Sequence, residues 1–365
     1  MSEKSVRITF QKLILPIAAF CLVAPLNAQN AIKQKVDSIL QAKKEKVDSL
    51  YNVADSLIKE HRVVARIDSI IDKKQEKDDF DHQYIRRPKE RWTLKARLNI
   101  AGTHLVSRLV NDDNRIKSVL NTDLKTTINF AASYRGIALG LGVNPVKLFK
   151  KNTDYELNVN SYGSKFGFDV VLQRTNSLNG NIKMGNENIY IPRGLVRQMA
   201  FTTNVYYTLN NRHFSWAAAL NQSVEQRKSA GSVLLGASFL AIRTKNGRSE
   251  ELQLPAMRIY MGHIGIGGGY AYNFIVDRHW LIHGSIMPTF VIINRNNITM
   301  NNVKRDMPYY FPNVITTSRF AAIRYHKNYF WGFTAVVNNS VVGRRDHLQM
   351  IYTKWRTRLI FGLRL

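Results

Sequence analysis

The chain has 365 residues, of which 53 are Lys or Arg and 26 are Asp or Glu, so its formal net charge is +27. A soluble globular protein rarely carries such an excess, which leaves three explanations: binding of nucleic acid, attraction to an anionic membrane surface, or cations that line an aqueous cavity. The single cysteine, Cys21, lies in the apolar segment described next, so the chain beyond it has neither a disulfide nor a cysteine metal site.

The first 28 residues predict a secretory signal peptide. Lys4, Arg7 and Lys12 form a basic leader, residues 13–26 are an uncharged apolar run, and Ala28 supplies a small residue for cleavage. No later stretch of about 18 apolar residues follows, so the sequence offers no candidate for a transmembrane helix. Export also argues against nucleic acid as a partner, and leaves either a soluble exported protein or a β-barrel.

Residues 29–90 differ from the rest of the chain and predict a charged helical arm. The segment has no Gly, and its only Pro is Pro88. Its apolar residues recur at spacings of three, four and seven, as at Ile32, Val36 and Ile39, which places one apolar stripe along a helix. This pattern fits a solvated periplasmic arm, or a helix that pairs with itself or with a periplasmic partner.

From Trp92 onward the period of the apolar residues changes to two. In residues 92–100 and 354–365, large apolar side chains alternate with Lys, Arg, Thr or Asn. The same alternation marks the segments 126–130, 137–143, 166–172, 199–209, 270–276, 280–292 and 331–337. Strands with one apolar and one polar face are typical of a transmembrane β-barrel. We therefore predict an all-β fold for residues 91–365, an antiparallel barrel of about twelve strands, with a soluble β-sandwich as the alternative.

The connections between these segments predict how the barrel is oriented, because barrels of this class have short periplasmic turns and longer external loops. Short turns are expected at 134–136, 210–212, 277–279 and 326–328, and long loops at 101–121, 175–197 and 294–313. The alternation is weakest in 154–161 and in 229–242, and the second of these also fits a helix. Pro288 predicts a bulge or a strand end, because it cannot donate to a ladder.

A basic stripe is expected on the lumen wall. If the apolar faces meet hydrocarbon, the charged faces must meet the lumen, because a charge at mid-bilayer costs about 2–4 kcal/mol. Pairing of the first and last strands gathers Lys95, Arg97, Arg324, Lys354, Arg356 and Arg358. These cations need counter-charges, either acids such as Asp169 and Glu156 or anions from outside. The stripe fits a barrel filled by internal salt bridges, an anion-selective pore, or a site for an anionic ligand.

One pair of residues raises the question of an enzyme. His283 and Ser285 are two positions apart, so they point to the same side of one strand, as in outer-membrane acyl hydrolases that combine a Ser nucleophile with a His base. The sequence identifies no acidic or amide side chain that would orient the His, and two polar residues on a polar face need no special role. They are the catalytic candidates of a chain for which we expect no enzyme activity, no cofactor and no metal site.

Short Gly-rich phrases carry a resemblance to a known family. Residues 133–142, 228–232 and 267–274, together with 283–285 and Pro288, are similar to an uncharacterised family of outer-membrane β-barrels found in Bacteroidota, a domain of unknown function. The resemblance covers residues from about 85 to the end of the chain. It implies a barrel, and it carries over neither an activity nor functional residues.

The sequence thus predicts a barrel of a Gram-negative outer membrane with a structural or transport role and a basic lumen. Basic residues in the expected external loops, such as Arg193 and Arg197, suit contact with outer-membrane lipid and lipopolysaccharide. Two alternatives remain open, a lipid acyl hydrolase of the outer membrane and a barrel for surface binding or adhesion.

Overall fold

The chain divides into two compact units, Met1–Lys77 and Asp78–Leu365. The computed structural model describes residues 79–365, except 112–113, 135–136, 144–153, 248, 251–255, 278, 301, 308, 310 and 345–347, and before them only residues 41 and 69. The predicted signal peptide and residues 29–78 of the predicted arm therefore lie outside the described residues, apart from those two positions.

The second unit is built from strands and one short helix. Its elements are β1 (Ile85–Arg86), β2 (Trp92–Asn111), β3 (Asn114–Asn121), β4 (Lys125–Tyr134), β5 (Ile137–Val143), β6 (Tyr155–Tyr162), β7 (Phe166–Met184), β8 (Glu187–Thr208), α5 (Trp216–Leu220), β9 (Glu225–Gln226), β10 (Ala230–Asn246), β11 (Met257–Val276), β12 (Trp280–Met300), β13 (Val303–Asp306), β14 (Val314–His326), β15 (Tyr329–Gly343) and β16 (Leu348–Arg364). None of the described helices is long and apolar enough to cross a membrane.

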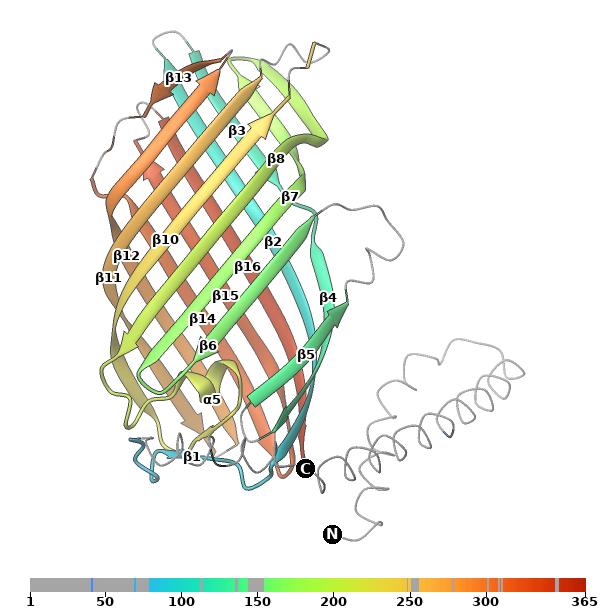
Figure 1. Ribbon diagram of the computed structural model, residues 1–365, viewed down its shortest axis with the longest axis vertical. Coiled ribbons are helices and arrows are strands. Elements are labelled where there is room, and N and C mark those ends of the chain that lie inside the picture. Colours follow the sequence, from blue (N-terminus) through green and yellow to red (C-terminus); the bar gives the residue numbers. More distant parts are fainter. Residues whose placement is uncertain are drawn as a thin grey trace. The chain divides into compact units, whose positions relative to one another are not determined.

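One antiparallel sheet closes on itself to form a barrel. Ten strands make the closed ring, in the order β16–β15–β14–β12–β11–β10–β8–β7–β3–β2, and β2 pairs again with β16. Closure leaves no free edge in this ring, which is how a sheet satisfies its backbone groups where no water is available. Figure 1 shows the long, tilted strands around a common axis.

The wall contains more strands at the end that carries α5. There β4 continues β3 along β2: β3 pairs with residues 104–111 of β2, and β4 pairs with residues 92–101. The short strands β5 and β6 extend the wall from β4 and from β7, so twelve strands stand at this end. The number expected from the sequence thus describes one end, and the other end has ten strands. Within the described residues, which omit 144–153, no pairing joins β5 to β6.

A buried acid lies where the wall divides. The Asp154 carboxylate accepts hydrogen bonds from the backbone N–H of Asn176 at 2.5 Å and of Ser177 at 3.2 Å, and from the Ser177 hydroxyl. The Lys125 ammonium lies 3.6 Å from it. The register of β7 against β8 shifts beside these residues, so the carboxylate satisfies backbone donors at an irregular point of the ladder.

Side chains along the long strands alternate between the outside and the lumen. In β16, Leu359 is 57% exposed whereas the next residue, Ile360, is 4% exposed. Exposed large apolar side chains surround the barrel, among them Phe130, Leu157, Phe166, Leu235, Ile266, Phe274, Ile286 and Ile293. An apolar outer surface of this extent suits hydrocarbon and not water. The soluble sandwich is excluded, because the apolar faces are not packed between two layers.

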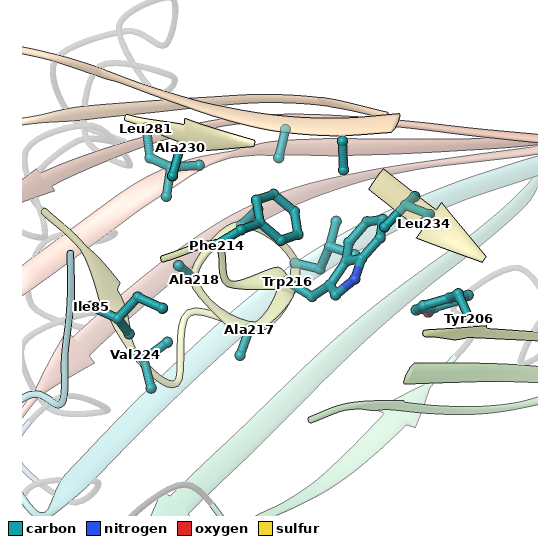
Figure 2. Close-up of a cluster of buried hydrophobic side chains, with 14 of the residues drawn as sticks. Ile85, Tyr206, Phe214, Trp216, Ala217, Ala218, Val224, Ala230, Leu234 and Leu281 are labelled. Carbon is teal, nitrogen blue, oxygen red and sulfur yellow. The ribbon is translucent and has the colours of Figure 1, made fainter. Parts of the chain in front are cut away.

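The segment between β8 and β10 folds into the lumen and fills the α5 end. Ser215 caps α5 by accepting a hydrogen bond from the backbone N–H of Ala218 at 3.3 Å. A buried cluster, here called the plug cluster, includes Ile85, Tyr206, Phe214, Trp216, Leu220, Val224, Leu234, Leu281 and Met287. Figure 2 shows Phe214 and Trp216 packed within this cluster, with Ile85 and Val224 beside each other.

The last part of the predicted helical arm, residues 79–90, is described and is not helical. It contains β1, which pairs with β9 of the plug segment. Ile85 is fully buried in the plug cluster. The helix prediction was wrong for this part because packing against the plug outweighs local propensity, and because Pro88 limits any helix that approaches it.

A second buried cluster, here called the upper cluster, fills the lumen at the other end of the barrel. Its members come from most strands of the ring and include Leu105, Leu120, Leu178, Ile191, Val196, Leu240, Ile242, Met261, Val291, Ile315 and Met350. Apolar side chains thus pack inside the barrel both at the α5 end and at the opposite end.

The long loops expected at 101–121 and 175–197 are mostly strand. Residues 101–121 form the hairpin of β2 and β3, and residues 175–197 form the hairpin of β7 and β8. Gly185, with a φ of +58°, supports the tight turn of the second hairpin. Polar residues at these strand ends gave them the composition of loops. The two segments of weak alternation, by contrast, are the strands β6 and β10.

Pro288 lies inside β12, at a point where the pairing with β11 is interrupted. The register runs through Gly267↔Thr289, and it resumes at Tyr270↔Ile286. A Cβ atom added at Gly267 would collide with the backbone of Pro288 and Thr289. A close backbone approach thus accommodates a residue that cannot donate to the ladder.

We expect Trp216→Ala to destabilise the barrel strongly, because it removes the largest buried side chain of the plug cluster and its 2.9 Å hydrogen bond to Thr208. A loss of about 3–5 kcal/mol follows from the cavity. The measurement is the temperature at which the compact band is lost on a heat-modifiability gel. The control is Trp331→Ala, because Trp331 lies on the exposed outer face. Equal shifts for both variants would contradict the role of the plug.

Candidate functional site

The basic residues of β16 and β2 lie on the inner wall. Lys354, Arg356 and Arg358 occupy alternate positions of β16, and Lys354 is 5% exposed. Lys95 and Arg97 take the equivalent inner positions on β2, which pairs with β16 in antiparallel register. Closure of the barrel therefore places these five side chains in one stripe along the inner wall.

Some of these cations have partners that neutralise or hold them. Glu156 forms ion pairs with Lys354 at 3.0 Å and with Arg356. Lys95 donates to the backbone carbonyl of Asn221 at the end of α5, and Arg364 pairs with Glu225 of β9. One part of the basic wall is thus balanced by an acid from β6, and another part fastens the plug segment to the wall.

Arg97 and Arg358 differ from these cations in their partners. Among the described residues neither has a carboxylate within ion-pair distance, and Arg358 Nε donates only to Asn99 Oδ1 at 2.9 Å. Because Arg358 pairs with Asn99 in the ladder, Arg97 is its diagonal neighbour on the same face. Diagonal neighbours are about 7–8 Å apart at the backbone, within reach of two long side chains. The inner wall thus holds two arginines at diagonally adjacent positions, and no carboxylate of the described residues lies within ion-pair distance of either.

Arg324 does not belong to this stripe. In β14 the inner face carries Ile323, which is fully buried, whereas Arg324 is exposed. Its guanidinium lies 5.6 Å from the ring centroid of Trp280, which packs against Trp331. The prediction reversed the two faces of this strand. An outward Arg is tolerated here because it lies near a strand end, where aromatic rings and long cationic side chains reach the membrane interface.

A second polar group, which the sequence did not identify as a unit, surrounds Arg319. The Asp169 carboxylate accepts hydrogen bonds from Tyr162 at 2.8 Å and from Tyr206 at 3.0 Å, and it pairs with Arg319. The Arg319 guanidinium lies 4.6 Å from the ring of Tyr206 and 5.4 Å from that of Trp216. The acid–arginine contact joins β7 to β14 across the lumen, so no sequence pattern within one strand reveals it.

His283 and Ser285 lie inside the barrel and are in contact. His283 is fully buried, and its Nε2 is 3.2 Å from Ser285 Oγ. Its Nδ1 is 2.7 Å from Oδ1 of Asn273 on β11. Asn273 is the amide that the sequence analysis did not find. A signal was available, because counting outward from the predicted turn at 277–279 pairs residue 273 with residue 283, as the register does.

The hydrogen bonds around Asn273 determine the proton positions on His283. Asn273 Nδ2 donates to the Ser215 carbonyl at 2.9 Å and to Gln226 Oε1 at 3.1 Å, so Oδ1 is left to accept. His283 Nδ1 must then carry the proton, and Nε2 is an acceptor for the Ser285 hydroxyl. This is the tautomer that a general base needs.

The closed ring, the apolar outer surface and the polar, partly charged lumen define the class of the protein, a transmembrane β-barrel. The model of a family described as a domain of unknown function, DUF4421, matches residues 79–364, and the chain belongs to that family. A comparison with curated proteins gave no match.

Several solved structures are similar at low sequence identity. One is the outer membrane protease OmpT from Escherichia coli, at 7% identity, covering 75% of this chain and 97% of that chain, with a TM-score of 0.42. Another is the translocator domain of the autotransporter NalP from Neisseria meningitidis, at 8% identity, covering 83% and 97%, with a TM-score of 0.29. A third is OprG from Pseudomonas aeruginosa, at 9%, covering 78% and 99%, with a TM-score of 0.26. These likenesses carry no argument about activity.

We expect Asp169→Asn to destabilise the barrel, because it leaves the buried Arg319 guanidinium without its counter-charge. Breaking a buried pair costs about 3–5 kcal/mol. The heat-modifiability midpoint should fall, and the double variant with Arg319→Met should recover much of the loss. Asp306→Asn is the control, since its carboxylate is exposed. The proposed pairing fails if Asp169→Asn behaves like Asp306→Asn.

Proposed function

We propose that the protein is an outer-membrane barrel of a Gram-negative bacterium, as in the Bacteroidota family that its sequence resembles, and that it binds a phosphate-type anion inside its lumen at Arg97 and Arg358. The observation that carries this proposal is the pair of arginines at diagonally adjacent positions of the inner wall, neither of which has a carboxylate within ion-pair distance among the described residues. The site keeps two inner-wall members of the basic stripe, Arg97 and Arg358, which have neither a carboxylate within ion-pair distance nor a hydrogen bond to the plug segment among the described residues.

The chemistry of the two side chains supports an oxyanion as the ligand. Arg is charged at all physiological pH values, and its planar fork matches two oxygens of a phosphate or carboxylate group. Two such groups side by side in a partly desolvated lumen repel each other, and an anion placed between them removes that repulsion. Phosphate accepts from both forks at once, which a single carboxylate does less well.

The filled interior argues for binding rather than free conduction. The plug cluster occupies the α5 end, and the upper cluster occupies the opposite end. Packed apolar side chains leave no water-filled path through such a region. A transport role therefore requires a movement of the plug segment, whose anchors include Lys95 and Arg364.

We expect the purified barrel to produce no steady ion conductance in a planar bilayer at neutral pH, because apolar side chains fill both ends. Loosening the plug by replacing Lys95 and Arg364 with Gln removes two of its anchors, and should produce brief openings selective for anions. Arg193→Gln, which removes an exposed cation outside the lumen, is the control and should remain silent. A stable open channel in the unaltered protein would contradict the occluded lumen.

We expect phosphate-type ligands to raise the thermal midpoint of the detergent-solubilised protein. The probes are inorganic phosphate and a short-chain phosphatidic acid, with the matching phosphatidylcholine as the zwitterionic control. At a hundredfold excess over the dissociation constant, the stabilisation should be about 2.7 kcal/mol. The shift should vanish in the variant Arg97→Gln/Arg358→Gln and persist in Arg193→Gln.

The two probes also separate the sources of the anion. A shift with phosphatidic acid alone indicates a lipid headgroup, and a shift with both indicates free phosphate or any phosphate ester. Without ligand, the double variant should be at least as stable as the unaltered protein, because a repulsive pair is gone. No shift with either probe, or equal shifts in the double variant, would overturn the proposal.

A further inference from the structure

We propose that Ser285 is the nucleophile of an acyl-ester hydrolase site inside the barrel, with His283 as its general base and Asn273 as the residue that positions the base. The three side chains form a continuous hydrogen-bonded chain across the neighbouring strands β11 and β12. Nucleophile, base and orienter in this order are the requirement for activating a serine, and an amide serves as orienter in known variants of the arrangement.

The surroundings favour this function over a purely structural network. Asn273 contacts the plug segment at Ser215 and Gln226, and the His283 ring lies 5.3 Å from that of Trp216 and 6.1 Å from that of Phe214, so both residues also support the plug. The contact between His283 Nε2 and Ser285 Oγ, in contrast, lies within β12 and holds no part of the plug.

Arg319 supplies donors for the oxyanion that forms during ester hydrolysis. Its Cα pairs directly with that of Ser285 in the ladder between β12 and β14. Its side chain is 1% exposed, and Nη2 is engaged with Asp169. Nε and Nη1 are buried and have no hydrogen-bond acceptor among the described residues. Buried unpaired donors are rare because they cost free energy, and an oxyanion formed at Ser285, the ladder partner of Arg319, would satisfy them.

The chemistry of the neighbouring residues indicates the substrate class. The next inner-face residue after Ser285 is Met287, which belongs to the plug cluster together with Trp216. Because the plug cluster is packed, an ester reaches Ser285 only when the plug segment moves, and its acyl chain then contacts apolar side chains of that cluster. We therefore assign the substrate as an ester of an apolar carboxylic acid.

The reaction balances with water as the only co-reactant. Ser285 Oγ forms a bond to the acyl carbon while its proton passes to His283 Nε2, and the carbonyl oxygen becomes the oxyanion. The ester C–O bond then breaks, and His283 returns the proton to the leaving alcohol. Water attacks the acyl-serine by the same route, with its proton passing through Nε2 to Ser285, and releases the carboxylic acid.

This site is independent of the anion site proposed above. It uses β11, β12 and β14, whereas Arg97 and Arg358 belong to β2 and β16. Binding of phosphate does not require Ser285, and hydrolysis of an ester does not require Arg97. Failure of one proposal therefore leaves the other standing.

The test is covalent labelling of the folded full-length protein by an alkyl fluorophosphonate, followed by peptide mass spectrometry, together with hydrolysis of p-nitrophenyl butyrate. We expect the adduct on the peptide that contains Ser285. Ser285→Ala should abolish labelling and hydrolysis, and His283→Gln should slow both by about 10²–10⁴-fold. The control is Ser238→Ala, since Ser238 is also a buried inner-face serine but bonds to Asn204 instead of a His.

Heat-modifiability gels establish that each variant is folded before it is compared. Ser238→Ala should retain both the adduct and the hydrolysis rate. Absence of an adduct on the folded unaltered protein, or equal labelling after Ser285→Ala, would overturn the proposal.

Two variants of Asn273 separate its role in orienting His283 from its role in supporting the plug. Asn273→Ala loses both the acceptor for His283 Nδ1 and the donors to Ser215 and Gln226. Asn273→Asp keeps the acceptor and loses the donors. If Asn273 positions the base, Asn273→Asp should label at a rate within about tenfold of the unaltered protein, while Asn273→Ala falls by about a further 10²-fold. Equal losses in both variants would show a structural role only.

Discussion

The absence of water from the hydrocarbon core of a bilayer is the constraint on which this structure depends. Every backbone N–H and C=O group in that layer must find a partner within the protein. The pairing of β16 with β2 meets this demand for the ring by closing the sheet. The same demand accounts for Asp154, which supplies acceptors where the register of β7 shifts and the wall divides. Closure of the sheet also separates a lumen from the outer surface of the barrel.

The separation of lumen from outer surface determines where the charged side chains lie. Alternation along each strand turns apolar side chains toward hydrocarbon, and so it directs the cations of β16 and β2 into the lumen. There the protein treats them in three ways. Glu156 forms ion pairs with Lys354 and Arg356, and the plug segment binds Lys95 and Arg364. Arg97 and Arg358 have no carboxylate within ion-pair distance in the part of the chain that the structure describes. The Arg97–Arg358 pair and the group of Ser285, His283 and Asn273 both face the lumen because of the same alternation in a closed barrel.

The sequence predicts the parts of the fold that depend on local alternation. The period of two from Trp92 onward, the two faces of β16, and the short turn at 277–279 all follow from neighbouring residues. Local alternation does not predict features that depend on contacts between strands far apart in the sequence. The helix prediction fails at Ile85 because a plug formed by residues far along the chain buries it.

The same distinction applies to the candidate site. Lys95 and Lys354 are placed correctly by alternation, because each lies in a long regular strand. Arg324 is placed on the wrong face, because its strand ends at an aromatic interface that tolerates an outward cation. The Arg319–Asp169 pair joins strands far apart in the sequence, so its register is not available from either strand alone. The pairing of Asn273 with His283 could have been predicted, because the short turn at 277–279 determines the register of the two strands.

The central claim is that the barrel wall turns apolar side chains to hydrocarbon and cationic ones to the lumen. It is tested most directly by spin labels placed one at a time along β16 in liposomes. Cys21 is the only cysteine, so its replacement leaves a cysteine-free background. The account predicts high collision rates with oxygen dissolved in the membrane at positions 355, 357, 359 and 361, and low rates at positions 354, 356, 358 and 360. Collision rates without a period of two, or equal contact of all eight labels with a water-soluble nickel complex, would contradict it.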